Sequence, residues 1–572
     1  MNQKNVFDLV IMGGGLAGQT LARQVKRLRP ETSVLIAEKR SHPVREAAFK
    51  VGESTVEIGA HYFGEILGLA EHLKAAQLPK MGLRYFFSAG SNRDIGERME
   101  VGASSWPPVP SFQLDRGRFE NMLGGENLKH GVHFLDDCRV HGVEQEDDGY
   151  RVNLSRGERD IAVRGRWLVD ASGRAAILKR RFGLGERVGH KGNAVWFRMD
   201  GEIDLDAWGG GDAWQDRLGT GLRRLSTNHL MGPGYWVWLI PLASGSTSVG
   251  VVADPALHPL KRLRRFEAAL DWLHEYEPQV GRYVEEHRGK VQDFAVQREY
   301  AHGCRRVFST DRWCITGEAG VFNDPFYSPG SDLIAISNTF IADMVTRFLD
   351  GENVDRRVES YNRIFLRTFQ TWLPVYEQQM PVMGNAQVMT AKIVWDSATY
   401  WGATAPLFFN GKFCDLEFME DFGPELWRFN QLNARLQAFF VEWLSAAGPE
   451  QAKQGSYLDL LKMTNLYGLQ RGIAERLGDT ELRKRLSHNI DLCEKLAAEI
   501  FKGATRHLGY ELEADKINPH AITLQPDRWD EDGLFSEKGR RAIGNEWAPE
   551  LELMWFDTAP LTTAEDATTT VH

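Results

Sequence analysis

The sequence predicts an α/β protein built in three parts. A glycine-rich motif follows an apolar strand near the N-terminus, the middle of the chain is rich in aromatic and β-branched runs, and helical spacing takes over beyond Asn338. The chain has 572 residues, a length that accommodates two to four domains at about 150 residues each. We therefore expect a parallel-sheet domain interrupted by a second sheet, with a helical region after both.

The composition is that of an ordered globular protein. Hydrophobic residues make up 42% and charged residues 26%, and the formal net charge of -10 contains no long run of one sign, which disfavours a nucleic-acid partner. No apolar stretch reaches the roughly 18 residues of a spanning helix, and no signal peptide precedes the first strand. We expect no membrane partner and a cytoplasmic location.

Metal chemistry is not indicated by the sequence. The five cysteines are an odd number at wide spacings, as in reduced cytosolic thiols, and the 16 histidines form no paired-ligand pattern. We therefore expect no metal, and chemistry that comes from an organic cofactor or from acid, base and nucleophile side chains.

The N-terminal glycine motif predicts a dinucleotide site. Residues 7–12 form an apolar strand, and Gly13, Gly15 and Gly18 follow in a G-x-G-x-x-G pattern that opens a helix. The first glycine permits the tight turn, the second admits the pyrophosphate, and the third lets helix and strand pack closely. Glu38 ends the next strand, where an acid can accept hydrogen bonds from ribose hydroxyls.

Three later segments resemble motifs of FAD enzymes. Residues 113–120 are similar to a Q-x-x-R-x-x-F-D/E segment, residues 167–174 to the strand and turn that close the FAD domain, and residues 317–325 to a G-D-A-x-x-x-x-D-P signature at the ribityl chain. Their order along the chain matches those enzymes. The resemblance implies FAD and a glutathione-reductase-like, Rossmann-type fold.

The same resemblance implies which residues bind FAD. The position of Arg116 contacts the flavin nucleotide in these enzymes, and Glu318 stands where Asp is usual. Residues 49–55 are similar to a V-G-E-A/S segment that lies alongside the flavin. The implied cofactor-binding residues are Gly13, Gly15, Ala17, Gly18, Glu38, Lys39, Lys50, Val51, Gly52, Arg116, Gly317, Glu318 and Asp324.

A tryptophan pair points to the type of flavin chemistry. Residues 234–241 resemble the W-x-W-x-I-P motif of flavin-dependent halogenases. Trp236 and Trp238 are two residues apart and share one face of a strand, where they can screen the flavin from an organic substrate. The resemblance assigns Ile240 and Pro241 to the same screen.

Residues 324–330 correspond to the halide-binding D-P-x-x-S-x-G segment of those halogenases. The correspondence assigns halide binding to Ser328, Pro329 and Gly330, although Pro329 lacks a backbone donor. The tryptophan-halogenating branch has an acid where this chain has Tyr327. The sequence therefore resembles the phenol-acting branch of the tryptophan halogenase superfamily.

Lys80 is the candidate for delivering the halogen. It opens a K-x-G-x-x-F/Y strand after V-G-E, as the catalytic lysine does in phenol-acting halogenases. Its ammonium can hydrogen-bond hypohalous acid, and its neutral amine can carry the halogen as a haloamine. Lys50 is a rival candidate, and Arg84 a weaker one because it cannot release its proton.

The resemblance implies an FADH2-dependent halogenase that uses O2 and chloride or bromide on a small electron-rich, phenolic arene. No nicotinamide-linked D-G motif is present, so reduced flavin is expected from a separate NAD(P)H-dependent flavin reductase. A single-component FAD-dependent aromatic hydroxylase is the alternative, and a non-catalytic flavin protein is a third interpretation. The arene's identity, its attachment to a carrier, the preferred halide, the regioselectivity and the oligomeric state, monomer or homodimer, stay open.

The domain prediction follows the same pattern. Residues 1–345 should form the FAD domain, with a substrate-side sheet at about 81–113 and 189–300, and residues 346–572 a mainly helical region that covers the substrate pocket. The expected helices are 339–349, 359–372, 424–446 and 479–508, and residues 558–572 should fray. The aromatic residues between 372 and 409 could line a substrate pocket, but we expect them to belong to the hydrophobic core.

Overall fold

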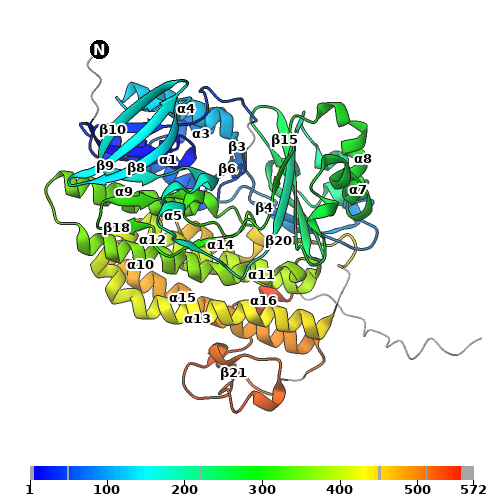
Figure 1. Ribbon diagram of the computed structural model, residues 1–572. Helices are drawn as coiled ribbons and strands as arrows, with labels where there is room; N and C mark the ends of the chain where they lie inside the picture. The colour runs from blue at the N-terminus through cyan, green and yellow to red at the C-terminus, as the bar shows by residue number, and fades with distance from the viewer. Residues whose placement is uncertain (1–5, 48–49, 219–221, 449–451, 511, 555–572) are drawn as a thin grey trace, which may run out of the picture.

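The computed structural model describes residues 6–47, 50–218, 222–448, 452–510 and 512–554. The expected fraying of residues 558–572 lies outside this part of the chain. The α/β fold is confirmed: two mixed sheets lie side by side over a layer of helices (Figure 1). In the described residues, no helix is both long and apolar enough to cross a membrane.

The first sheet presents the glycine motif. Its strands run in the order β18 (Phe308–Ser309), β19 (Trp313–Ile315), β10 (Arg159–Asp170), β1 (Val6–Met12), β2 (Val34–Ala37) and β7 (His133–Leu135), with β8 (Arg139–Glu146) and β9 (Gly149–Arg156) beside β10. β1 pairs in parallel with both β2 and β10, so Met12 lies opposite Ala37 and Asp170. The strand ends therefore meet at one edge, where α1 (Leu16–Leu28) begins.

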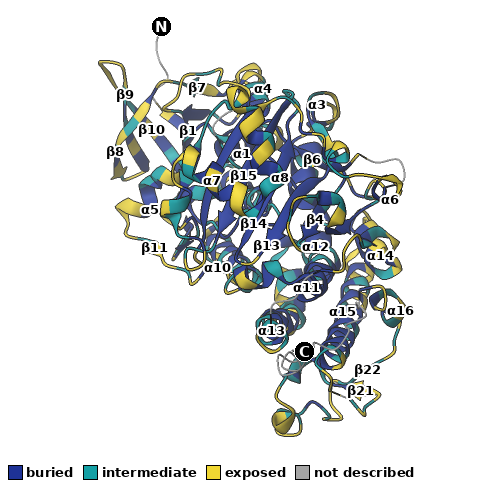
Figure 2. Ribbon diagram, turned by 90° about the vertical axis from the view of Figure 1, so that its right-hand side faces the viewer, coloured by how far each residue is buried: buried dark blue, intermediate teal, exposed yellow. Residues whose placement is uncertain are grey.

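The second sheet carries the tryptophan pair. Its order is β16 (Ala295–Gln297), β12 (Asn193–Asp200), β15 (Ser246–Ala253), β14 (Tyr235–Pro241), β13 (Thr227–Gly232), β4 (Leu83–Phe87), β5 (Met99–Gly102) and β20 (Tyr457–Asp459). One face packs with α7 (Phe266–Tyr276) and α8 (Pro278–Glu286), two helices within the stretch where strands were expected. Both faces are buried, as the dark strands of Figure 2 show.

β20 was not foreseen from the sequence. This short strand from the C-terminal region pairs in parallel with β5, with Tyr457 opposite Glu100, and so extends the second sheet. The predicted domain boundary at residue 345 stays a prediction. β20, which lies beyond that boundary in the sequence, belongs to the same sheet as β5, which lies before it.

The four expected helices are present, but three of them begin earlier than predicted: at Gly330 rather than 339, at Asp355 rather than 359 and at Leu416 rather than 424. The helices of this region are α9 (Gly330–Leu349), α10 (Asp355–Trp372), α11 (Ala386–Thr399), α12 (Ala405–Phe409), α13 (Leu416–Ala447), α14 (Thr464–Gly472), α15 (Asp479–His507) and α16 (Ala548–Leu551). α13 begins before Pro424, where a helix start was expected, because the Asp415 side chain caps it by accepting from the Phe418 N–H. α13 and α15 pack against each other below the sheets (Figure 1).

Shorter elements complete the fold. They are α2 (Glu57–His61), α3 (Ala70–Ala76), α4 (Arg116–Lys129), α5 (Ile177–Arg181), α6 (Asp212–Gln215), β3 (Leu78–Lys80), β6 (Ser111–Gln113), β11 (Gly185–Glu186), β17 (Gly303–Cys304), β21 (Lys516–Ile517) and β22 (Arg541–Ala542). β3 and β6 form a separate two-stranded antiparallel ribbon, with Lys80 opposite Ser111.

A buried ion cluster fixes β4 and β5 to the loop before β13. The fully buried Glu100 carboxylate accepts from Arg84 and from Arg223, whose Nε and Nη2 lie 3.0 and 3.1 Å from it. Arg84 also donates to the carbonyl oxygen of Ala103. The Arg84 guanidinium therefore has a structural role, which makes Arg84 a weaker candidate for delivering the halogen.

We predict that Glu100→Gln strongly destabilises the fold. The amide removes one negative charge among three guanidinium groups, those of the buried Arg84 and Arg223 and of Arg217. Such a loss costs about 3 to 5 kcal/mol in comparable buried pairs. Urea unfolding of the purified protein measures this free energy. Glu97→Gln, at an exposed neighbouring position, is the control and should change it by less than about 0.5 kcal/mol. Equal stability of the two variants would contradict the role of the cluster.

Candidate active site

The glycine motif forms a tight turn with an open face. Gly13 has a φ of +119°, and a Cβ there would lie 2.3 Å from the Ala171 carbonyl oxygen, while a Cβ on Gly18 would lie 2.0 Å from the Gly13 carbonyl oxygen. A Cβ on Gly15 would meet nothing within 4 Å. The first and third glycines are therefore required by packing, and the second faces space at the start of α1 that suits a phosphate.

Glu38 lies directly at this turn. One carboxylate oxygen accepts from the Gly14 N–H at 2.7 Å and the other from the Arg40 N–H at 2.8 Å. Ala17 is buried in the first turn of α1, against Gly317, whereas Lys39 is exposed next to Glu38. The loop, the helix N-terminus and the acid fit the pyrophosphate and ribose of FAD.

Lys50 and Arg116 share one partner away from Lys80. The Lys50 ammonium and the Arg116 guanidinium both pair with the buried Glu120 carboxylate, and Arg116 also donates to the carbonyl oxygens of Val51 and Gly52. Burial lowers the pKa of Lys50, against the attraction of Glu120. This cluster fixes the segment that was expected to lie beside the flavin.

Asp324 binds protein groups. Its carboxylate accepts from the Tyr300 hydroxyl at 2.5 Å, from His190 Nε2 at 2.6 Å and from the Phe326 N–H at 2.7 Å. Glu318 is half-buried and accepts from Gln297 at 3.0 Å, next to Gly317 at a φ of +62°. Asp324 therefore positions the segment after it, while Glu318 stays open to a ligand on its exposed side.

The expected halide segment has an unusual backbone. Tyr327 and Ser328 have φ angles of 66° and 59°, and the Ser328 N–H donates to the Pro325 carbonyl oxygen at 3.0 Å. Pro329 precedes α9, and a Cβ on Gly330 would meet nothing within 4 Å. The Ser328 N–H is therefore already used, whereas the Gly330 N–H at the start of α9 has no acceptor within the described residues.

Trp236 and Trp238 share one face, as their spacing predicts. Both are buried, their ring centroids are 5.7 Å apart, and Trp236 packs against Phe326 at 5.2 Å. Phe326 in turn stacks near Tyr327, at 4.2 Å. Ile240 and Pro241 end the same strand. An aromatic layer thus adjoins the candidate halide segment.

Lys80 lies in a cavity of about 910 Å³. The side chain is 1% exposed, and its ammonium donates to the Thr55 carbonyl oxygen at 2.7 Å and to Ser54 Oγ at 2.9 Å. Burial lowers the pKa of Lys80 to about 7, although Glu57 and Asp332 oppose the shift. Lys80 lines this cavity, and Lys50 does not.

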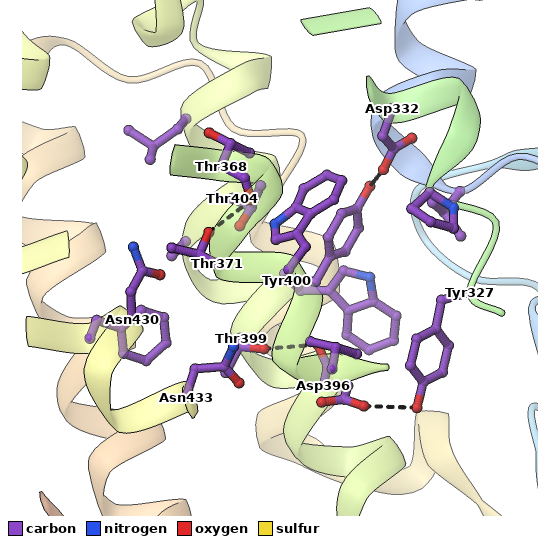
Figure 3. A pocket seen from close by; sticks show the side chains of 18 of the residues that line it. Tyr327, Asp332, Thr368, Thr371, Asp396, Thr399, Tyr400, Thr404, Asn430 and Asn433 are labelled. Atoms are coloured by element: carbon purple, nitrogen blue, oxygen red, sulfur yellow. Dashed lines mark hydrogen bonds between the residues drawn. The ribbon is translucent and has the colours of Figure 1, made fainter. Parts of the chain in front are cut away.

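Three buried acids that line the same cavity, Asp332, Glu57 and Asp396, were missed by the sequence analysis. Asp332 on α9 accepts from the Tyr400 hydroxyl at 2.6 Å (Figure 3) and from the Gly59 N–H at 2.8 Å. Glu57 on α2 accepts from Gln470 at 3.2 Å. Burial raises the pKa of Asp332 to about 7 and also raises that of Glu57. No local motif marks them, because they come from separate elements.

Residues 7–220 match the FAD binding domain family. A flavin-dependent halogenase of Dictyostelium discoideum, chlA, is 28% identical over 446 residues, which are 71% of this chain and 71% of that protein. A 1H-pyrrole-2-carbonyl (peptidyl-carrier protein) brominase of Pseudoalteromonas luteoviolacea is 24% identical over 62% of this chain and 80% of its own. The chain is thus similar in sequence to flavin-dependent halogenases.

Solved halogenase structures have the same fold. The crystal structure of halogenase PltM in complex with phloroglucinol and FAD superposes with a TM-score of 0.60 at 18% identity, over 86% of this chain and 96% of that one. Flavin-dependent brominase Bmp2 gives 0.53 at 22% identity, over 66% and 87%. These structures show the fold, and the match of residues 7–220 to the FAD binding domain family makes FAD the cofactor of this chain.

We predict that Gly15→Ala and Gly18→Ala fail in different ways. Ala fits at position 15 in the protein alone but obstructs the phosphate, so FAD affinity should fall at least about tenfold while the melting temperature without FAD is unchanged. Ala at position 18 should lower that melting temperature, because its Cβ meets backbone. Flavin fluorescence titration and thermal unfolding separate the two. Parental FAD affinity in Gly15→Ala would contradict the binding mode.

We predict that Lys80 titrates near pH 7, below the ordinary range of lysine. NMR of protein labelled with ¹³C at lysine Cε should show a resonance with this midpoint that is absent from Lys80→Ala. In Asp332→Asn the midpoint should fall further, because a negative charge that favours the ammonium is lost. A Lys80 midpoint near 10, or a rise in Asp332→Asn, would contradict this electrostatic description.

Proposed function

We propose that the protein is a flavin-dependent halogenase that uses reduced FAD, O2 and chloride or bromide to halogenate an electron-rich, phenolic arene held beside Lys80. The observation that carries the proposal is the buried Lys80 amine in a large cavity, adjoining the aromatic layer of Trp236, Phe326 and Tyr327. Such a layer keeps an organic ring from the flavin while a small reagent passes.

Within the described residues, the hydrogen bonds of Lys80 leave one of its donors free. An ammonium has three N–H groups, and two of them are used by the Thr55 carbonyl oxygen and Ser54 Oγ. The third can bind the oxygen of hypohalous acid and polarise the halogen toward the ring. With a pKa near 7, the same group can also lose its proton and carry the halogen as a haloamine.

A phenol suits the acids around Lys80. Halogenation of a ring replaces a hydrogen, and that proton needs an acceptor within the cavity. Asp332 and Glu57 are buried carboxyl groups with raised pKa values, and the pKa of Asp332, about 7, lets it exchange a proton near neutral pH. A phenolic hydroxyl can donate to the same oxygens, which would orient the ring.

The halide and the reductant follow from the same proposal. We assign halide binding to the start of α9, where the Gly330 N–H is open. Reduced flavin would come from a separate NAD(P)H-dependent reductase. No observation favours the hydroxylase alternative, because its chemistry needs the ring to reach the flavin, and an aromatic layer adjoins the cavity.

We predict that Lys80→Ala keeps FAD but forms less than about 1% of parental halogenated product, because the reagent loses its guide. The assay supplies FAD, a flavin reductase, NADH, O2 and bromide with a panel of phenols, indoles and pyrroles, and detects bromine isotope patterns by mass spectrometry. Omitting the reductase should stop both NADH consumption and product.

Lys74→Ala is the matched control, since this side chain is 69% exposed on α3. It should retain parental yield. Parental yield from Lys80→Ala together with loss in Lys50→Ala would move the assignment to Lys50. Rapid NADH oxidation without the reductase would favour the single-component hydroxylase.

A further inference from the structure

The cavity that holds Lys80 is elongated. α10 lines it from Ser360 to Trp372 on one face, and at 1.5 Å per residue this stretch is about 18 Å long. α13 lines it over a comparable stretch, from Leu416 to Ala434. Volumes of roughly 300 to 1,000 Å³ accommodate drug-sized ligands, so one ring beside Lys80 leaves most of the 910 Å³ free.

The two ends of the cavity differ in chemistry. Figure 3 shows Asp332 and Tyr327 on one side of Tyr400, and Thr368 and Thr371 on the other. The buried titratable groups Lys80, Glu57 and Asp332 lie together at the first end. Between α10 and α13 the charged lining residues, Arg363, Arg367 and Glu420, are exposed side chains at the surface. The second end is lined by half-buried or buried apolar residues of α10, α12 and α13: Ile364, Leu407, Leu416, Met419 and Leu426.

The threonine hydroxyls at the second end have no free donor for a ligand, because each donates to a backbone carbonyl oxygen of α10. Thr368 Oγ1 donates to the Ile364 carbonyl oxygen at 2.9 Å, and Thr371 Oγ1 to the Thr368 carbonyl oxygen at 2.9 Å. Their donors are thus used by their own helix. Beyond them the cavity reaches residues at the surface, among them Trp427, which is 65% exposed.

We infer that the substrate is an arene with a hydrocarbon chain, the ring beside Lys80 and the chain between α10 and α13. The inference deepens the proposed function and rests on it for the position of the ring. Apolar walls of this extent gain free energy only if an apolar ligand covers them. A free amphipathic phenol supplies both chemistries, whereas a single-ring phenol leaves the apolar end in contact with water.

The test compares resorcinol with 4-hexylresorcinol by isothermal titration calorimetry on the FAD-loaded protein. Each fully buried methylene tightens binding by about fourfold, so partial burial of the hexyl chain should tighten it at least tenfold. Met419→Trp on α13 and Ile364→Trp on α10 fill the apolar end. Each should reduce the advantage of the hexyl compound at least fivefold and leave resorcinol affinity unchanged.

Ala438→Trp is the matched control, an exposed position on α13 that does not line the cavity. It should keep the full advantage. Equal affinities of the two resorcinols for the parent protein, or an advantage that survives both filling variants, overturns the inference. Because binding is measured without turnover, parental halogenation by Lys80→Ala would refute the proposed role of Lys80 without affecting this result.

Discussion

The site depends on keeping one amine out of water. Lys80 is held by the carbonyl oxygen of Thr55, and Thr55 is itself fixed to β6, because its N–H donates to the Phe112 carbonyl oxygen and its hydroxyl accepts from the Phe112 N–H, both at 2.9 Å. β6 pairs with β3, which carries Lys80. The cost of burying the amine is thus met by a closed set of hydrogen bonds between three short segments.

The same segments connect the cavity to the second sheet. Glu53, two residues before Thr55, forms a buried ion pair with Arg198 of β12 at 2.7 Å, and Ser54 Oγ lies 2.9 Å from Thr227 Oγ1 of β13. The tryptophan pair is on β14, the next strand. The indole N–H of Trp236 is buried and, within the described residues, has no acceptor, so the aromatic layer keeps one donor for a ligand.

Residue spacing along the chain was sufficient to predict the features that depend on neighbouring residues alone. The glycine turn, the shared face of Trp236 and Trp238 and the long helices all follow from spacing along the chain. Glu57, Asp332 and Tyr400 could not be predicted, because they belong to α2, α9 and the helical turn after α11 and meet only through packing. Asp324 shows the reverse case, a motif residue whose carboxylate is taken by Tyr300 and His190.

The charge of the cavity changes in one direction with pH. Burial lowers the pKa of Lys80 and raises that of Asp332, both to about 7, so below this pH the amine is charged and the carboxyl neutral. Above it the amine is neutral and the carboxylate charged. A halide anion is attracted in the first state and repelled in the second. The two pKa shifts therefore act together. Burial enables Lys80 to exchange its proton near neutral pH, and it also keeps Asp332 protonated at lower pH, which removes a negative charge that would repel a halide.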